Sequence, residues 1–227
     1  QTCTVGSGTG TIDGANVTNV SVACEPDIIA GYRSRWTLSS TPLDSGAAEN
    51  DLSGFTVELH QPAEFTTYST TEKKAGPSSA QFSGEILLES EDDLYDTNPA
   101  AYSIALWIYP TGSGSLTTFV FRGNDVSGFR MSYNEGDIGV GFELPDLTAA
   151  IEQDTWTHVV LTYKHDGTAV NLYKNGEKVG ETFVGDYSET LMDTLKLGEG
   201  WTGYIDDVVL YDSELSAAQV AELYGYY

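Results

Sequence analysis

The chain has 227 residues, which is enough for one large β domain or a domain with an appendage, and it carries 34 acidic against 10 basic residues. The resulting net charge of −24 repels a phosphate backbone, which excludes nucleic acid as a partner. No run of about 18 apolar residues is present, so the sequence predicts no membrane insertion. The 24 glycines and 14 tyrosines, with almost no long helical pattern, are typical of an all-β protein.

Residues 1–25 differ from the rest of the chain. Their two cysteines, Cys3 and Cys24, predict a disulfide that staples a β-hairpin and indicate an oxidising compartment. A metal pair is the weaker alternative, because neither a CxxC motif nor a nearby His accompanies them. The ending VTNVSVAC resembles the closing segment of small repeated β-domains in large bacterial surface proteins. We therefore expect residues 1–25 to be the end of a preceding module or a linker, in a chain that is a mature or excised piece of a longer protein.

A second domain, predicted for residues 28–227, contains many short β patterns separated by turn signals. The spacing of these signals, roughly 8–12 residues, is typical of an antiparallel sandwich. Near the end, Ser216 precedes an apolar pattern of helical period and predicts one short helix with Ser216 as its N-cap. Strands are expected at 30–38, 55–59, 80–89, 102–109, 117–122, 128–133, 136–144, 157–163, 169–174, 177–183, 194–197 and 204–211, with loops at 39–54 and 66–79.

The stretch Trp156–Phe183 gives the strongest local prediction. Residues 157–163 alternate between two faces, with Trp156, His158 and Val160 pointing to the same side. Further on, Asn175-Gly176 joins two strand patterns and suits a type I′ turn, in which both central residues have positive φ. The stretch predicts antiparallel β structure.

Three motifs then carry a family resemblance: AQFSGEILLESEDD with YSIALWIYPT, WTHVVLTYKHDGTAVNLYKNGEKVGE, and LKLGEGWTGYIDDVVLYDSELSAAQVAELY. In this order they resemble a laminin-G-like domain of the concanavalin A-like jelly-roll superfamily, in its bacterial secreted form, over about residues 28–225. The resemblance implies an all-β, two-sheet antiparallel jelly-roll sandwich with one short C-terminal helix. It also implies a secreted or cell-surface location and often a calcium ion or a glycan ligand, although this fold hosts several activities.

Calcium is the first chemistry to consider, because it binds six to eight oxygen atoms on adjoining loops. Asp44, Asn50 and Asp51 lie in one loop, where the family's early motif is stretched after Trp36. Alternation in the strand 204–211 places Asp206 on an apolar face, and a buried carboxylate must be paired or metal-bound. These four oxygen-bearing residues form the predicted calcium site. The alternative is that Asp206 accepts backbone hydrogen bonds and ties down a loop, and the acidic run 89–93 is interpreted as a solvated turn.

Glycan binding is the second function to consider. Sugars pack on aromatic faces, and Trp36, Trp201 and Tyr204 are the candidate ligand-binding residues. Trp201 lies in the glycine-rich turn 198–203 and is expected to be exposed. The aromatic residues of the strand motifs, Trp107 and Trp156, are assigned to structure, as is His158.

Catalysis is the third function to consider, and the sequence does not favour it. Retaining glycanases of this fold use an E-x-D-x-x-E arrangement on one strand face, and the nearest match, Glu152-x-Asp154, lacks the last acid. No GxSxG, HExxH or phosphate-binding loop is present. The sequence therefore predicts a non-catalytic binding module, directed at a glycan or cell-surface polysaccharide and stabilised by calcium, in a larger secreted or cell-surface bacterial protein. The alternative is a structural or adhesive subunit that pairs with neighbouring modules or chains through residues 1–25.

Overall fold

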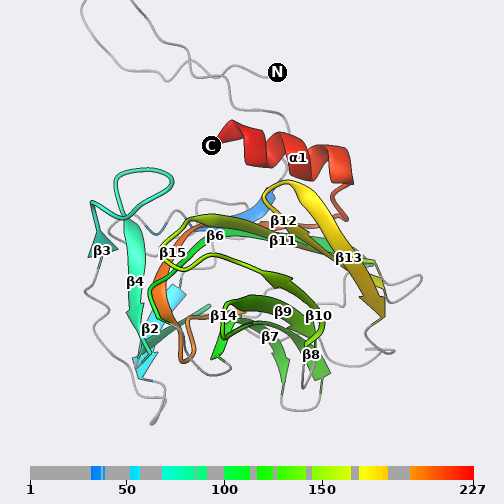
Figure 1. Ribbon diagram of the computed structural model, residues 1–227. Helices are drawn as coiled ribbons and strands as arrows, with labels where there is room; N and C mark the ends of the chain where they lie inside the picture. Colours follow the sequence, from blue (N-terminus) through cyan, green and yellow to red (C-terminus); the bar gives the residue numbers. More distant parts are fainter. Residues whose placement is uncertain are drawn as a thin grey trace, which may run out of the picture.

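The computed structural model describes residues 32–36, 38, 52–56, 68–84, 86–90, 100–112, 117–124, 127–141, 145–164, 169–183 and 195–227. They form two antiparallel β-sheets that face each other, with one helix, α1 (Ala217–Tyr226), lying across the outer face of one sheet (Figure 1). The predicted all-β sandwich with a short terminal helix is confirmed. Over these residues no helix is long and apolar enough to cross a membrane.

The sheet beneath α1 has eight strands, and all their pairings are antiparallel. The order is β13 (Glu177–Phe183), β12 (Ala169–Lys174), β11 (Thr157–Lys164), β6 (Ala101–Pro110), β15 (Thr202–Tyr211), β4 (Ser79–Ser83) and β3 (Tyr68–Ser69), and β1 (Tyr32–Trp36) also pairs with β15.

The second sheet has seven strands, again antiparallel. Its order is β10 (Pro145–Ala150), β9 (Asp137–Gly141), β8 (Ser127–Asn134), β7 (Thr117–Asn124), β14 (Leu195–Leu197), β5 (Ile86–Ser90) and β2 (Leu52–Thr56).

The central hairpin agrees with the sequence prediction. Asn175 and Gly176 have φ values of 50° and 83°, as the type I′ turn requires. The turn also packs on the helix, because a Cβ placed on Gly176 would stand 3.1 Å from the ring of Tyr224. Glycine at this position therefore satisfies both the backbone conformation and the contact with α1.

One predicted strand is wrong, and two observed strands, β3 and β10, were not predicted; β3 lies in the predicted loop 66–79, and β2 begins at Leu52, inside the predicted loop 39–54. The single strand expected at 80–89 is two strands, β4 and β5, which lie in different sheets. Gly84 between them has a φ of 89°, a conformation that side-chain-bearing residues rarely adopt, and the chain changes sheets there. β10 was not predicted, because residues 145–150 lack a clear alternation of β-branched residues.

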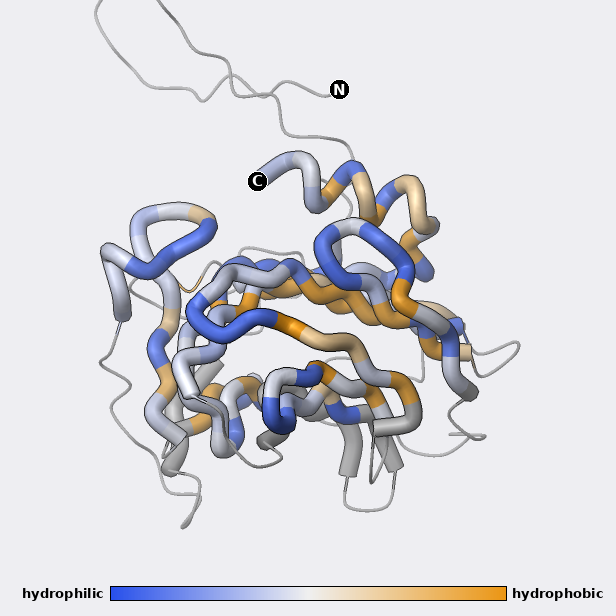
Figure 2. The backbone as a smooth tube through the Cα atoms, viewed as in Figure 1, coloured by the Kyte–Doolittle hydropathy of each residue, from blue (hydrophilic) through white to orange (hydrophobic). Residues whose placement is uncertain are grey.

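The apolar residues form two clusters. The larger lies between the sheets, and the smaller lies between the eight-stranded sheet and α1, where Val160 and Val209 meet Val220 and Leu223 of the helix. In Figure 2 hydrophobic residues concentrate in the strands of the two layers, whereas the turns at the edges are hydrophilic. The predicted N-cap is confirmed: the Ser216 side chain accepts from the Gln219 N–H, and the Gln219 side chain accepts from the Ser216 N–H.

Candidate functional site

Asp206 lies on the outer face of the eight-stranded sheet, directly opposite Trp107 of β6. The apolar face that alternation predicted for Asp206 in the strand 204–211 would also contain Val208, and this part of the prediction is wrong. The β15–β6 register shifts between Asp206 and Val209, and Asp207 within the shift has a φ of 46°. This bulge turns Val208 into the core between the sheets while Asp206 stays outside it.

The Asp206 carboxylate fastens a loop. Its Oδ2 accepts hydrogen bonds from the backbone N–H groups of Lys74 and Ala75, each at 2.7 Å. Oδ1 has no hydrogen-bond partner, and the residue is fully buried. Burial, together with the charge of Asp207, raises the Asp206 pKa to about 7, against the opposing effect of hydrogen bonds from the backbone N–H groups of Ala75, Lys74 and Asp207. The geometry is therefore that of the alternative interpretation, in which the carboxylate ties down a loop.

The calcium prediction is not tested by this geometry. Asp44, Asn50 and Asp51 lie outside the described residues, and so do Cys3, Cys24 and the rest of residues 1–25. Within the described ranges no group of three or more potential metal-ligating His, Cys, Asp or Glu side chains is found. Asp206 offers one free oxygen, and a complete calcium site would need the undescribed loop.

Asp207, the next residue, makes an ion pair that sequence reasoning missed. Its two carboxylate oxygens accept from Nε and Nη2 of Arg35 at 2.7 and 3.1 Å. Asp207 is buried, and the Arg35 side chain is 14% exposed. A paired bidentate geometry of this kind compensates the burial of both charges. The signal in the sequence was the Asp206-Asp207 pair itself, of which only the first residue was considered.

In the middle of the outer face of the eight-stranded sheet lie three buried residues on adjacent strands, which we call the covered strip: Trp107 on β6, His158 on β11 and Asp206 on β15. The loop 70–78 and α1 lie over it: Lys74 Nζ stands 4.1 Å from the centre of the Trp107 ring, and Tyr224 stacks on the same ring at 5.7 Å. Burial, with the positive charge of Lys74, lowers the His158 pKa to about 3. His158 is therefore neutral near pH 7, and its assignment to structure agrees with this burial.

Trp36 and Trp201 do not lie on the surface, so the prediction that Trp201 is exposed is wrong. Both are at most 1% exposed and belong to the core between the sheets. Trp201 packs edge-on against Tyr133, with ring centroids 5.5 Å apart. The glycines of the turn explain the error: a Cβ on Gly203 would collide with the Tyr109 carbonyl and approach the Trp201 indole, so the turn closes inward over the ring. Both rings therefore face the core and present almost no surface to solvent.

Tyr204, the third aromatic candidate, does lie on the outer face, where it joins Tyr109, which sequence reasoning left out, and Trp156, which it had assigned to structure. Tyr109 stands directly opposite it on β6, with ring centroids 5.6 Å apart, and Trp156 lies 5.4 Å from Tyr109 on the other side. All three side chains are partly exposed. We call these three residues the aromatic cluster. Alternation could have identified Tyr109 and Trp156, because Tyr109 sits on the face of β6 that points away from the core and Trp156, just before β11, continues the alternation of that strand on the same side as His158.

Carboxylates border the aromatic cluster. Burial raises the Tyr109 pKa, and the negative charges of Glu72 and Asp154 raise it further. Asp154 is exposed and has a φ of 54°, and its N–H donates to the Pro110 carbonyl at 2.8 Å. In the same turn the Gln153 side chain donates to the Thr111 carbonyl at 3.1 Å. The turn 152–155 is thus fixed to the end of β6, and it holds polar groups at the rim of the aromatic surface.

The comparisons with known proteins agree with this architecture. Residues 82–221, more than half of the chain, match a laminin-G family of the concanavalin A-like lectin/glucanases superfamily. The chain belongs to this family. A comparison of the sequence with curated proteins gives no match.

Solved structures with a similar fold include domain 4 of AbnA, a GH43 extracellular arabinanase from Geobacillus stearothermophilus, in complex with arabinotriose. It is 19% identical with a TM-score of 0.62, and the match covers 85% of this chain and 98% of that domain. The binding domain of botulinum neurotoxin DC in complex with SialylT is 13% identical with a TM-score of 0.65, covering 87% of this chain and 52% of that one. At these identities the likeness shows the fold, and this chain spans about half the length of the neurotoxin domain.

Proposed function

We propose that this chain is a non-catalytic glycan-binding module of a larger secreted or cell-surface bacterial protein, and that the aromatic cluster contacts the sugar. The observation that carries the proposal is the grouping of Tyr109, Trp156 and Tyr204, partly exposed, with neighbouring ring centroids at most 5.6 Å apart, beside Glu72 and Asp154. Sugar rings present apolar C–H faces that pack on aromatic rings, while their hydroxyls bond to carboxylates.

The similar structures support the ligand class. The arabinanase domain, which this fold covers almost completely, was solved with arabinotriose, and the neurotoxin binding domain, of which the match covers 52%, was solved with SialylT. Family membership alone would leave the activity open, since one fold serves many functions. The exposed aromatic surface is what favours glycan binding in this chain.

A binding role without catalysis is supported by the placement of the nearest acidic motif. Glu152 and Asp154 lie in the turn before β11, both exposed, and do not project from one strand face. A retaining glycosidase needs two carboxyl groups about 5 Å apart across the scissile bond. We extend the proposal to calcium, which would be held by Asp44, Asn50 and Asp51 with Asp206, and would supply structural stability.

Isothermal titration calorimetry against a saccharide panel that includes arabinotriose and sialylated oligosaccharides tests the proposal. We expect a saccharide that binds the wild type and binds Trp156→Ala about tenfold or more weakly, a change of about 1.4 kcal/mol. The matched control is Tyr226→Ala, which removes an exposed tyrosine of α1 outside the cluster and should leave the affinity unchanged. A blank panel, or equal effects of the two substitutions, would refute the proposal.

Calcium is tested separately. A thermal melt with and without a chelator should show a lower Tm after chelation, because binding to the folded state alone stabilises it. Metal content of the purified protein gives the stoichiometry. An unchanged Tm and no bound metal would remove calcium from the proposal and leave the aromatic surface as it stands.

A further inference from the structure

A concave site separate from the aromatic cluster lies on the same outer face, at the end of β11 opposite Trp156. Trp156 and Lys164 are eight residues apart, which corresponds to roughly 26 Å along an extended strand. The pocket has a volume of about 430 Å³ and opens between β12, β13 and the turn that leads into α1. That volume falls within the range of small-molecule sites, about 300–1,000 Å³. Its polar lining comprises Lys164, Asn171, Lys178, Glu181, Glu214 and Ser216.

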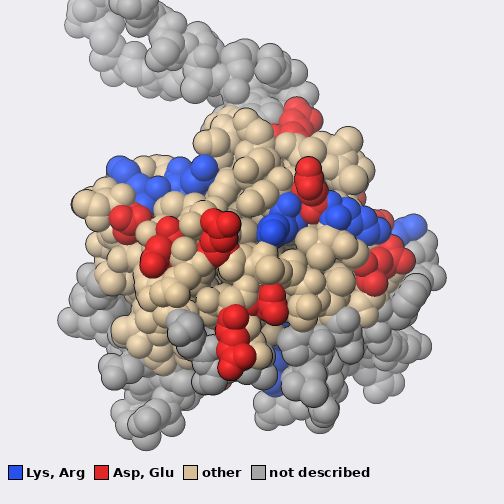
Figure 3. Space-filling model, viewed as in Figure 1, with Lys and Arg blue, Asp and Glu red and all other residues tan. Residues whose placement is uncertain are grey.

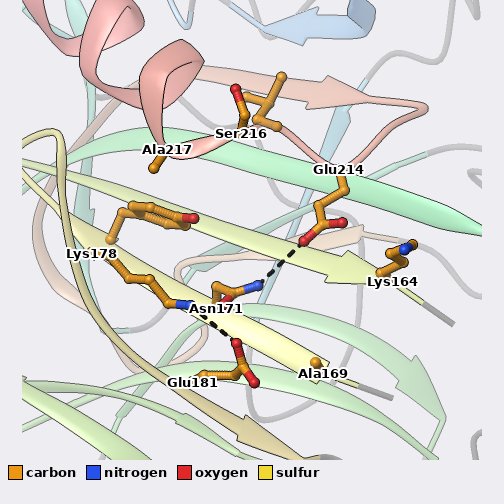
Figure 4. A pocket seen from close by; sticks show the side chains of 10 residues that line it. Lys164, Ala169, Asn171, Lys178, Glu181, Glu214, Ser216 and Ala217 are labelled. Atoms are coloured by element: carbon orange, nitrogen blue, oxygen red, sulfur yellow. Dashed lines mark hydrogen bonds and ion pairs between the residues drawn. The ribbon is translucent and has the colours of Figure 1, made fainter. Parts of the chain in front are cut away.

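Asn171 occupies the centre of this pocket, between Glu214 and Lys178 (Figure 4). It is 5% exposed, and its Nδ2 donates to Thr162 Oγ1 at 3.2 Å and to Glu214 Oε1 at 3.4 Å. A carboxylate only accepts hydrogen bonds, so the amide nitrogen must face Glu214, which fixes the orientation of the amide. Oδ1 is then left without a donor. Because leaving a buried carbonyl unsatisfied is unfavourable, a ligand donor at Oδ1 would recover that cost.

The charges around Asn171 balance. Lys178 pairs with Glu181 at 3.0 Å, and Lys164 and Glu214 add one charge of each sign. This local balance is unusual in a chain with a net charge of −24. Figure 3 likewise shows basic side chains gathered below α1 with acidic ones next to them. An anion would meet two glutamates and a cation two lysines, whereas a neutral ligand with several hydroxyls can donate to the carboxylates and accept from the ammonium groups.

We propose that this pocket binds a neutral saccharide unit by hydrogen bonding. One hydroxyl donates to Asn171 Oδ1, a neighbouring hydroxyl donates to Glu214, and a ring or hydroxyl oxygen accepts from Lys178. Ser216 and Ala217, at the start of α1, form the wall above it. The pocket differs in kind from the aromatic cluster, since it recognises hydroxyls rather than a sugar face. Its occupancy does not depend on the function proposed for the cluster.

Titration of the isotope-labelled protein, followed by NMR, tests this site directly. The probes are methyl glycosides of neutral hexoses and of arabinose, together with glucuronate as an anion and glucosamine as a cation. We expect a neutral glycoside to shift the side-chain amide signals of Asn171 at concentrations where glucuronate and glucosamine do not. Either charged sugar binding more tightly than every neutral one, or no probe shifting these signals, would overturn the proposal.

Two matched substitutions at the helix start separate the pocket from its surroundings. Ala217 lines the pocket and is exposed, so Ala217→Tyr fills it while all its polar groups remain, and affinity should fall about tenfold or more. Ala218→Tyr, one residue along and outside the lining, should change nothing. Unaltered binding to Ala217→Tyr refutes the site. Trp156→Ala should leave the Asn171 shifts intact, so failure at the aromatic cluster is distinguishable from failure at the pocket.

Discussion

Two neighbouring parts of the same sheet face carry the same kinds of side chain and differ in what covers them. In the covered strip, Trp107 and Asp206 lie beneath α1 and the loop 70–78. Further along the same sheet face, Tyr109 of β6 and Trp156, just before β11, stay partly exposed beside Asp154. Aromatic and acidic residues therefore stabilise the fold in the covered strip, whereas at the aromatic cluster they remain accessible to a ligand. The covering segments, and not the residue types, decide which role applies.

The largest expected contrast comes from removing one indole in each place. Trp107→Ala should lower the free energy of unfolding by about 3–5 kcal/mol, because Trp107 is 2% exposed and its removal leaves a cavity. Trp156→Ala should cost about 1 kcal/mol, since its ring is partly hydrated already. Urea denaturation measures both. Equal losses would mean that the two tryptophans share one environment.

A second large effect is expected at the ion pair beside the covered strip. Arg35→Ala removes the bidentate ion pair of the buried Asp207 carboxylate and should destabilise the fold by about 3 kcal/mol. The control is Arg33→Ala, whose pair with Asp212 is 3.6 Å long and partly exposed to solvent, and which should cost less than about 1 kcal/mol. Denaturant midpoints of the two variants provide the test; similar midpoints would contradict it.

The covered strip should also show two opposing pH dependences. The Asp206 pKa is raised to about 7. Its contribution to the free energy of unfolding is therefore complete below pH 3.8 and is lost as the pH rises toward 7. The His158 pKa is lowered to about 3. The stabilisation that neutral His158 provides is therefore complete above pH 6.5 and is lost as the pH falls toward 3. Between about pH 4 and 6.5 the two slopes oppose each other, each reaching at most about 1.4 kcal/mol per pH unit.

Single substitutions separate these slopes. Relative to wild type, the stability of Asp206→Asn should rise with pH over this window, and that of His158→Gln should fall. The free energy of unfolding measured at several pH values gives both slopes. Parallel pH profiles for wild type and Asp206→Asn would show that Asp206 titrates alike in the folded and unfolded chain.

The smallest effect on stability is expected from destabilising α1, the helix that covers the strip. Ser216→Ala removes the N-cap bond to the Gln219 N–H and should cost about 1 kcal/mol. Because α1 carries Tyr224 over the covered strip, a less stable helix should increase hydrogen exchange at His158 more than at Val140, which is buried in the second sheet. Exchange measured by NMR tests this; equal changes at His158 and Val140 would argue against a local role for α1.

Local chemistry made the fold predictable from the sequence. The Asn175-Gly176 turn and the strands beside it agree residue for residue with their prediction, and Ser216 caps the helix as its pattern indicated. Such features depend on residues within a few positions of each other. The candidate site, by contrast, depends on contacts between residues that are far apart in the sequence. Alternation failed just after Asp206 because the bulge needs a partner strand to be recognised, and Trp201 was misplaced because its turn closes onto β6.

The position of β15 has a consequence for how the chain folds. This strand lies between β6 and β4 and also pairs with β1, so residues 202–211 bind partners about 90 to 180 positions earlier in the sequence. Among the described strands, β3 and β4 connect to the rest of their sheet by hydrogen bonds only through β15. Contacts of such sequence separation pay a large loop-closure entropy, and two-state β-sandwiches of this kind fold on a timescale of about milliseconds to seconds. Docking of β15 is therefore the step at which the eight-stranded sheet becomes one cooperative unit.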